Sequence, residues 1–254
     1  MTSDFQLTIL GSGTMPPTKE RNPSGFLVKV GGKYILLDAG HGILRRLTDY
    51  GHSIQDPDIL FVSHFHTDHF SDAFALVHSR WVEDNYNFRK HKGIKIIGPD
   101  GLKKRFKLWR KIFWVEPKEK YPLNFLEGPK KIKIGKINIE TFAVHHVKWF
   151  KSVGIIIKYQ GKKIIYTGDI GTNHDFRELI KICKNADLLI TEASYEMPTP
   201  NHFTIGQVKE LVEKSDVKKV LVVHIRPQHL KRVEEVCKDN PKFILGIDGK
   251  KISI

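Results

Sequence analysis

The sequence predicts an α/β fold made of two halves, each a β-sheet with helices, stacked sheet on sheet. Short apolar runs of strand length recur along the 254 residues, and segments with helical spacing of apolar residues separate them. The order is strands, helices, strands and helices again, which is typical of two βα-type units. No linker or low-complexity tract divides the chain. We therefore expect one domain over residues 1–254.

The first half consists of strands joined by glycine turns, followed by helices. Gly31-Gly32 is typical of a hairpin turn, and Gly42 and Gly51 bound a stretch with apolar residues at helical spacing. The predicted strands are Phe5–Leu10, Gly25–Val30, Tyr34–Asp38, Ile59–Val62 and Ile94–Ile97, and the predicted helices are Gly42–Gly51, Phe70–Val82 and Leu102–Phe113.

The last of these helices is amphipathic. The apolar face predicted to lie in the core contains Leu102, Phe106, Trp109 and Phe113. The other faces carry Lys103, Lys104, Lys107, Arg110 and Lys111, and Arg89, Lys90 and Lys92 precede the helix. The basic residues have two interpretations: a solvated face, which is preferred, or a surface that contacts nucleic acid.

The second half repeats the order of strands and helices. Thr204 is predicted to cap a helix, because its hydroxyl can accept a hydrogen bond from a free backbone N–H. The predicted strands are Ile132–Ile134, Ile137–Val144, Gly154–Tyr159, Lys163–Thr167, Leu188–Thr191, Val220–Val223, Phe243–Leu245 and Lys251–Ile254, and the predicted helices are Asp175–Lys184, Thr204–Lys214 and Leu230–Lys238.

The net charge of +14 favours polyanionic partners, although a generally Lys-rich composition explains it equally well. The first residues lack the basic and apolar regions of a signal peptide, and no apolar segment is long enough to cross a bilayer. Cys183 and Cys237 show no metal-binding spacing. A cytoplasmic location without membrane association is the default expectation.

A His-x-His-x-Asp-His cluster directly follows the apolar run Ile59–Val62 and consists of His64, His66, Asp68 and His69. Imidazole nitrogens and carboxylate oxygens are the ligands that zinc and similar divalent ions accept. A solvated polar turn is the alternative. Three histidines within six positions, with an aspartate among them, favour a metal site in a loop that leaves a buried strand.

Further ligand-type residues follow three other predicted strands. His145-His146 follows Val144, Asp169 follows a strand that ends at Tyr166-Thr167-Gly168, and His224 follows Val223. Open α/β architectures place their sites where strands end. One loop cannot direct four ligands to one ion, so two ions that share a bridging carboxylate and water suit this set better. The residues themselves do not decide between His145 and His146.

This set of motifs resembles the metallo-β-lactamase superfamily, within it most closely the ribonuclease Z group and related phosphodiesterases. The resemblance covers essentially the whole chain. Other shared features are Leu10-Gly11-Ser12-Gly13-Thr14, Leu37-Asp38-Ala39-Gly40, the Tyr-Thr-Gly-Asp element at 166–169, Thr191-Glu192-Ala193-Ser194 and Asn201-His202-Phe203-Thr204. The resemblance implies a four-layer αββα sandwich with a two-metal site at the sheet edges.

The resemblance also implies roles for individual residues. His64, His66 and His146 would hold the first ion, and Asp68, His69 and His224 the second. Asp169 would bridge the two ions. Asp68 would also orient or deprotonate the bridging water, and His202, held by Glu192, would protonate the leaving oxygen. The ions are expected to be zinc, with manganese or iron as alternatives.

The resemblance implies cleavage of the 3′ trailer of precursor tRNA, but the chain departs from the family pattern. The segments between His146, Asp169 and His202 have no room for the long arm with which ribonuclease Z enzymes commonly grip tRNA. Trp149 and Phe150 are inserted near the metals. The alternatives are an armless hydrolase acting on a smaller phosphodiester or other ester, and a nucleic-acid-binding protein with a structural metal site. A homodimer is implied by the family alone.

Overall fold

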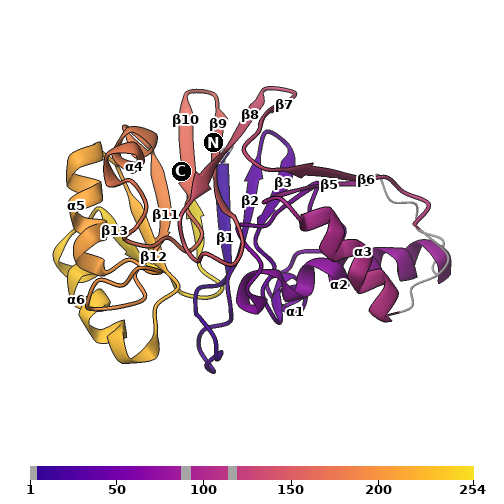
Figure 1. The fold of residues 1–254 in the computed structure, drawn as a ribbon, viewed down its shortest axis with the longest axis horizontal. Helices are drawn as coiled ribbons and strands as arrows, with labels where there is room; N and C mark the ends of the chain where they lie inside the picture. Colours follow the sequence, from indigo (N-terminus) through magenta and orange to yellow (C-terminus); the bar gives the residue numbers. More distant parts are fainter. Residues whose placement is uncertain (1–4, 87–92, 114–118) are drawn as a thin grey trace.

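The computed structural model describes residues 5–86, 93–113 and 119–254, and within these residues two seven-stranded sheets lie between two layers of helices (Figure 1). The first sheet has the order β14 (Lys251–Ser253), β1 (Phe5–Gly11), β2 (Gly25–Val30), β3 (Lys33–Leu37), β4 (Ile59–Phe61), β5 (Ile94–Gly98) and β6 (Leu123–Glu127). The second has the order β13 (Phe243–Leu245), β12 (Val220–Val223), β11 (Leu188–Glu192), β10 (Lys162–Tyr166), β9 (Ser152–Tyr159), β8 (Ile137–Val144) and β7 (Lys131–Ile134).

Helices cover the outer face of each sheet, so the four-layer αββα arrangement is confirmed (Figure 1). The first sheet is covered by α1 (Ile43–Asp49), α2 (Thr67–Tyr86) and α3 (Leu102–Phe113), and the second by α4 (Phe176–Cys183), α5 (Ile205–Ser215) and α6 (Leu230–Asp239), with a short 3₁₀ helix, η1 (Pro227–His229), before α6. None of the helices in the described residues has both the length and the apolar character needed to span a membrane.

Alternating side chains of each central strand enter two different cores. In β2, Phe26 and Val28 lie in the core between the sheets, whereas Leu27 packs under the helices. In β11, Leu188 likewise lies between the sheets and Leu189 under the helices. Strands buried on both faces read as continuous apolar runs, which is why the sequence located them well.

The carboxyl ends of six strands meet at one edge of the sandwich. β3 and β4 are parallel neighbours in the first sheet, and β10, β11 and β12 are parallel neighbours in the second. The strand β8 has the same direction as β10, because each is antiparallel to β9. The residues that follow these strands are therefore collected at a single edge.

Three predictions about elements need correction. The strand β6 was not predicted, because it is an edge strand whose residues are mostly half-buried and so lack a strong apolar signal. Helix α2 begins at Thr67 and not at Phe70, so Asp68 lies in its first turn. A carboxylate there interacts favourably with the positive end of the helix dipole. Phe113 was expected in the core but is 61% exposed, although its ring stacks on Phe74. The basic residues Arg89, Lys90 and Lys92 lie outside the described residues.

Candidate metal centre

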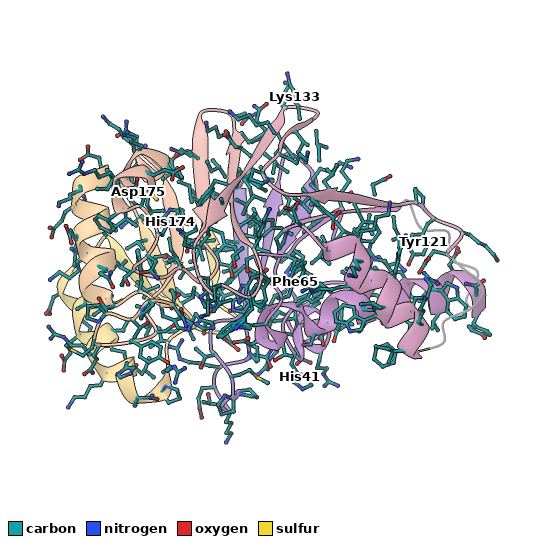
Figure 2. The ribbon with its side chains drawn as sticks, in the orientation of Figure 1. His41, Phe65, Tyr121, Lys133, His174 and Asp175 are labelled. Atoms are coloured by element: carbon teal, nitrogen blue, oxygen red, sulfur yellow. The ribbon has the colours of Figure 1, made fainter. Side chains whose placement is uncertain are left out.

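The structure brings together all seven residues predicted to bind metal. His64 and His66 lie in the loop after β4. Figure 2 labels their neighbour Phe65, which lies in the same loop between the two halves of the molecule. Asp68 and His69 lie in the first turn of α2. The remaining three residues follow β8, β10 and β12 and are His146, Asp169 and His224.

One group of four potential ligand atoms belongs to His64, His66, His146 and Asp169. Nε2 of His64 lies 3.0 Å from Nδ1 of His66, and Nε2 of His146 lies 3.2 Å from the same atom. Asp169 Oδ2 is 3.9 Å from each of the two Nε2 atoms. Two nitrogens bound to one zinc ion at a tetrahedral angle lie about 3.3 Å apart, so the spacing within this group suits one ion.

A second group consists of Asp68, His69 and His224. Nε2 of His224 lies 3.2 Å from Asp68 Oδ2. The carboxylate of Asp169 reaches this group as well: Oδ1 is 3.3 Å from His69 Nε2, and Oδ2 is 3.5 Å from His224 Nε2. Asp169 thus lies between the two groups, in the position that a bridging carboxylate requires.

The local backbone delivers Asp169 by a close approach of two strand ends. Gly168 has φ +62°, and a Cβ atom at this position would lie 2.5 Å from Cβ of Ser63. Only glycine satisfies both conditions without strain. His224 also has a positive φ, +50°, a conformation that costs free energy in a non-glycine residue and is often found at functional sites.

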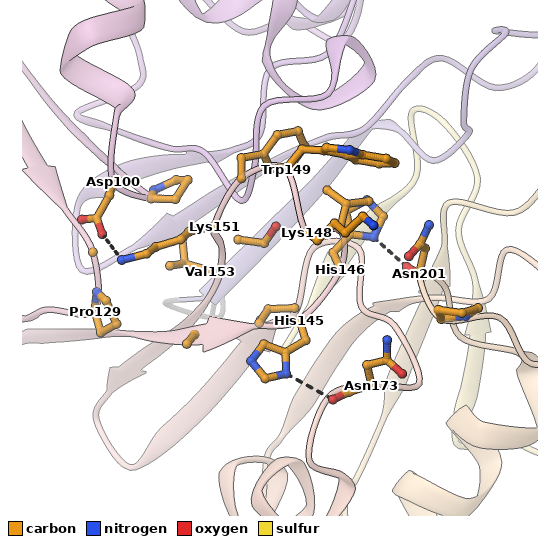
Figure 3. Close-up of a pocket in the computed structure, with 18 residues that line it drawn as sticks. Asp100, Pro129, His145, His146, Lys148, Trp149, Lys151, Val153, Asn173 and Asn201 are labelled. Carbon is orange, nitrogen blue, oxygen red and sulfur yellow. Dashed lines mark hydrogen bonds and ion pairs between the residues drawn. The ribbon is translucent and has the colours of Figure 1, made fainter.

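Hydrogen bonds on the far side of each ring fix the histidine tautomers. The backbone carbonyl of Asn201 accepts a hydrogen bond from His146 Nδ1 at 2.6 Å (Figure 3). The Ser194 hydroxyl donates to the His224 carbonyl at 2.6 Å, so His224 Nδ1 donates to Ser194 Oγ at 2.8 Å. In both rings Nε2 therefore keeps its lone pair for the cluster. Outer hydrogen bonds of this kind are typical of metal-binding histidines.

Asp38, which was not among the predicted site residues, organises this outer layer. The carboxylate is fully buried and accepts hydrogen bonds from Ser63 N at 2.6 Å, Ser63 Oγ at 2.7 Å and Tyr166 Oη at 2.6 Å. Its Oδ2 also accepts from His69 Nδ1 at 2.7 Å. Asp38 follows the apolar run of β3 just as Asp169 follows β10, so the same strand-end rule could have identified it.

The protonation states of the first group suit a cation. Burial lowers the pKa of His64, His66 and His146 because it disfavours the charged imidazolium. All three rings are then neutral. Nδ1 of His66 faces Nε2 of His64 at 3.0 Å and Nε2 of His146 at 3.2 Å. One imidazole proton cannot form two well-directed hydrogen bonds, so lone pairs stay close together and repel one another. A bound cation removes this repulsion.

The second group carries buried negative charge that also suits a cation. His69 Nε2 and Asp169 Oδ1 are buried and have no hydrogen-bond partner in the described residues. Burial would lower the pKa of His69, but the carboxylates of Asp169 and Asp38 raise it well above its usual value. The carboxylates thus attract positive charge to this position. The donor set and the orphaned atoms both fit divalent metal ions.

His202 and Glu192 form a third part of the site. Nδ1 of His202 lies 2.9 Å from Glu192 Oε2 and 3.8 Å from Asp169 Oδ2. Burial would lower the pKa of His202, but the Glu192 carboxylate, and then that of Asp169, raise it to about 9. These two residues, with His146 and Asp169, are also spaced as a possible metal group. Glu192 Oε1, however, already accepts from Ile170 N at 2.8 Å.

The structure separates the two neighbouring histidines after β8. His145 is exposed and its Nδ1 lies 3.1 Å from the carbonyl of Asn173, whereas His146 is buried and faces the cluster (Figure 3). This orientation follows from the alternation of side chains along an extended chain.

Comparison with known proteins agrees with this geometry. Residues 33–225 match the family described as Beta-lactamase superfamily domain. The chain is 22% identical to Ribonuclease Z of Archaeoglobus fulgidus, over 94% of this chain and 92% of that protein. It is 24% identical to Ribonuclease Z of Pyrococcus horikoshii, over 98% of this chain and 96% of that protein.

The fold is also similar to a solved structure, human tRNase Z, short form. The two structures have a TM-score of 0.80 and 20% sequence identity, over 98% of this chain and 99% of the human chain. The four layers, the strand-end cluster and the family match over residues 33–225 lead to one conclusion. The protein belongs to the beta-lactamase superfamily and has the metallo-β-lactamase fold.

Proposed function

We propose that this protein is a metal-dependent phosphodiesterase of the ribonuclease Z type that removes the 3′ trailer from precursor tRNA. The His202–Glu192 pair beside the metal cluster carries this proposal. A ribose leaving group needs a proton as its bond to phosphorus breaks, and a protonated histidine can supply it. The similarity to proteins named Ribonuclease Z over nearly the full chain supports the same reaction.

In this proposal two divalent ions are bound by the two ligand groups. His64, His66 and His146 would hold the first ion, Asp68, His69 and His224 would hold the second, and Asp169, whose carboxylate lies near both groups, would be shared by them. Zinc is the first choice, and manganese or iron suit the same ligands. Ions in such a site lower the pKa of a shared water and offset the charge that develops on the phosphoryl group.

The protein residues orient the reactants and move protons. Asp68 Oδ2 lies at the edge of the second group, 3.2 Å from His224 Nε2, where it can accept a proton from the attacking water. Glu192 holds Nδ1 of His202, so Nε2 is the atom that donates to the leaving oxygen. Asp68 and His202 therefore act as base and acid.

Arg226 supplies positive charge close to the acid. Its guanidinium lies 4.4 Å from the centre of the Tyr195 ring, and that ring is 5.3 Å from the ring of His202. Among the described residues no carboxylate pairs with Arg226. A guanidinium that is stacked but unpaired can bind a phosphate oxygen, and we assign it to the phosphate that is cleaved.

A smaller phosphodiester is the second candidate substrate, because the chain lacks segments that its relatives have. The alignment with the Archaeoglobus protein extends over 300 positions, whereas this chain has 254 residues. Only β9 and β10 lie between His146 and Asp169, so this part has no arm that could grip tRNA. The third interpretation, a structural metal site, is disfavoured by the poised His202–Glu192 pair.

The proposal also covers assembly and location. The resemblance to ribonuclease Z supports a homodimer. The two cysteines of the chain are unpaired, and the absence of a disulfide between them supports a cytoplasmic location.

The test is a paired assay on purified, metal-loaded protein with Asp68→Ala as the control. One substrate is a precursor tRNA with a 3′ trailer, and the other is bis(p-nitrophenyl) phosphate. We expect cleavage at the trailer junction, lost in the control. Turnover of the small diester alone would mean that the natural substrate is a smaller phosphodiester. If neither substrate were turned over, the phosphodiesterase proposal would be overturned.

A further inference from the structure

A cavity of about 940 Å³ opens beside the metal cluster. His146 lines this cavity and also belongs to the first ligand group, so the cavity and the cluster share this residue as a wall. Figure 3 shows His146 and Asn201 on one side of the cavity, and Asp100 with Lys151 on the other. Residues 147–151, here called the wall loop, form much of its lining.

The wall loop is anchored at Phe150 and Lys151. The ring of Phe150 stacks on His64 with its centre 5.8 Å away and lies 5.0 Å from the ring of His66. Lys151 Nζ forms an ion pair with Asp100 Oδ2 at 2.8 Å. The aromatic residue before these anchors is therefore held in place without being packed.

That residue, Trp149, is 72% exposed. Trp81, by contrast, is 7% exposed in the core under the helices. Burial of an indole ring is strongly favourable, because the ring has a large apolar area. A tryptophan on an anchored loop at the mouth of a reaction site thus offers a free aromatic face to a ligand.

The polar lining of the cavity complements the aromatic face. The ammonium group of Lys148 is exposed and has no carboxylate partner in the described part of the chain. Asn173 and Asn201 also line the cavity. Neither side-chain amide is hydrogen bonded to the described residues, and the bond that each residue makes to a histidine uses its backbone carbonyl. The amides are therefore free to donate and accept.

We propose that this cavity binds the nucleobase of the nucleotide next to the scissile phosphate, with Trp149 as the stacking surface. This inference rests on the proposed function. An aromatic face, free amides and a cation match the π-face, the polar edge and the phosphate of a nucleotide. Trp149 is thus a specificity residue that selects nucleotide esters over esters without a base.

The test compares two substrates that share one leaving group. Adenosine 5′-(p-nitrophenyl) phosphate carries a base, and methyl p-nitrophenyl phosphate does not. Trp149→Ala should raise KM for the adenosine substrate about 10-fold, within the range known for base stacking, and leave kcat unchanged. Its kinetics with the methyl substrate should equal those of the wild type, and Trp149→Phe should restore most of the lost affinity.

Two outcomes would overturn the inference. Equal effects of Trp149→Ala on both substrates would mean that the residue contacts the nitrophenyl ring or supports the loop. No effect on either substrate would mean that the base binds elsewhere. Trp149 is exposed, so we expect both variants to keep the melting temperature of the wild type.

A binding measurement separates this inference from the proposed function. Adenosine 5′-monophosphate should quench the tryptophan fluorescence of the metal-loaded protein, and ribose 5-phosphate should not. The quenching should be lost in Trp149→Phe. If the wild type cleaves neither diester, the phosphodiesterase proposal fails, but this titration still tests the base site. If adenosine 5′-monophosphate quenched Trp149→Phe as much as the wild type, the base site would be refuted.

Discussion

Nδ1 of His202 lies between the two carboxylate oxygens of Glu192, 2.9 Å from Oε2 and 3.1 Å from Oε1. The carboxylate comes from the last residue of β11, and the histidine from the segment that leads into α5. Because Glu192 stabilises the imidazolium form, the ring keeps its proton near neutral pH. This pair distinguishes the site from a simple metal-binding cluster.

The role proposed for His202 as an acid predicts a dependence on the leaving group. His202→Ala should lower kcat/KM for an RNA substrate by about 100-fold or more, because the ribose oxygen must be protonated as it leaves. The loss with bis(p-nitrophenyl) phosphate should be less than about 10-fold, since nitrophenolate leaves without a proton. Steady-state rates on both substrates test this difference. Equal losses would instead make His202 a metal ligand or a structural residue.

Arg226 is predicted to stabilise charge on the phosphoryl group. Arg226→Gln should reduce kcat about 10- to 100-fold. The substitution removes a charged donor whose interaction with the phosphoryl oxygen strengthens as negative charge develops in the transition state. Arg226→Lys should recover part of the rate but not the stacking on Tyr195. The measurement is kcat for precursor tRNA cleavage, with Arg232→Gln, an exposed residue of α6, as the matched control. An unchanged kcat in Arg226→Gln would refute the assignment.

Asp38 is predicted to control metal affinity although it lies outside the ligand set. Asp38→Asn should weaken binding of the second ion about 10- to 100-fold, because the amide no longer orients His69 as the carboxylate does. Competition titration with a chromophoric chelator measures this affinity. Tyr166→Phe removes only one hydrogen bond to Asp38 and should have the smaller effect. A larger effect of Tyr166→Phe would contradict this account.

Asp187 lies away from the metal cluster and is predicted to make the free energy of unfolding depend on pH. Its carboxylate accepts from Lys163 N at 2.8 Å and pairs with Lys218 at 2.9 Å. Burial would raise the pKa of Asp187, but these hydrogen bonds lower it below its usual value. A lowered pKa in the folded state means that the stabilisation is present above the unfolded pKa and is lost as the pH falls through the folded pKa.

Urea unfolding of the wild type and Asp187→Asn at several pH values tests this linkage. The wild type should be more stable by about 1 kcal/mol at pH 7, and the difference should shrink toward pH 3. A difference that stays constant with pH would show that the charge of Asp187 is not involved.

Much of the fold was predictable because central strands are apolar on both faces. The runs Ile59–Phe61 and Val220–Val223 are buried along their whole length, and Thr204 forms the predicted helix cap with Gln207 as a capping box. The edge strand β6 was missed because its burial is only partial. That residues 1–254 form one domain stays a prediction.

The site was predictable where a ligand-type residue directly follows an apolar run, as with His64, Asp169 and His224. The structure places all three in the cluster. Asp38 also directly follows an apolar run, but its role in the site comes from hydrogen bonds to Ser63 and Tyr166 that the sequence does not show. Tyr166 lies 128 positions away in the chain. Such contacts exist only after the two sheets pack together.

The metal content of purified protein is the most direct test of a two-ion site bridged by Asp169. The wild type should bind about two ions per chain, whereas His146→Ala and His224→Ala should each bind about one. His145→Ala is the matched control and should bind both ions, since its ring faces away from the cluster. A wild type that binds only one ion at saturation, or two variants that lose the same ion, would contradict the assignment of two separate ligand groups.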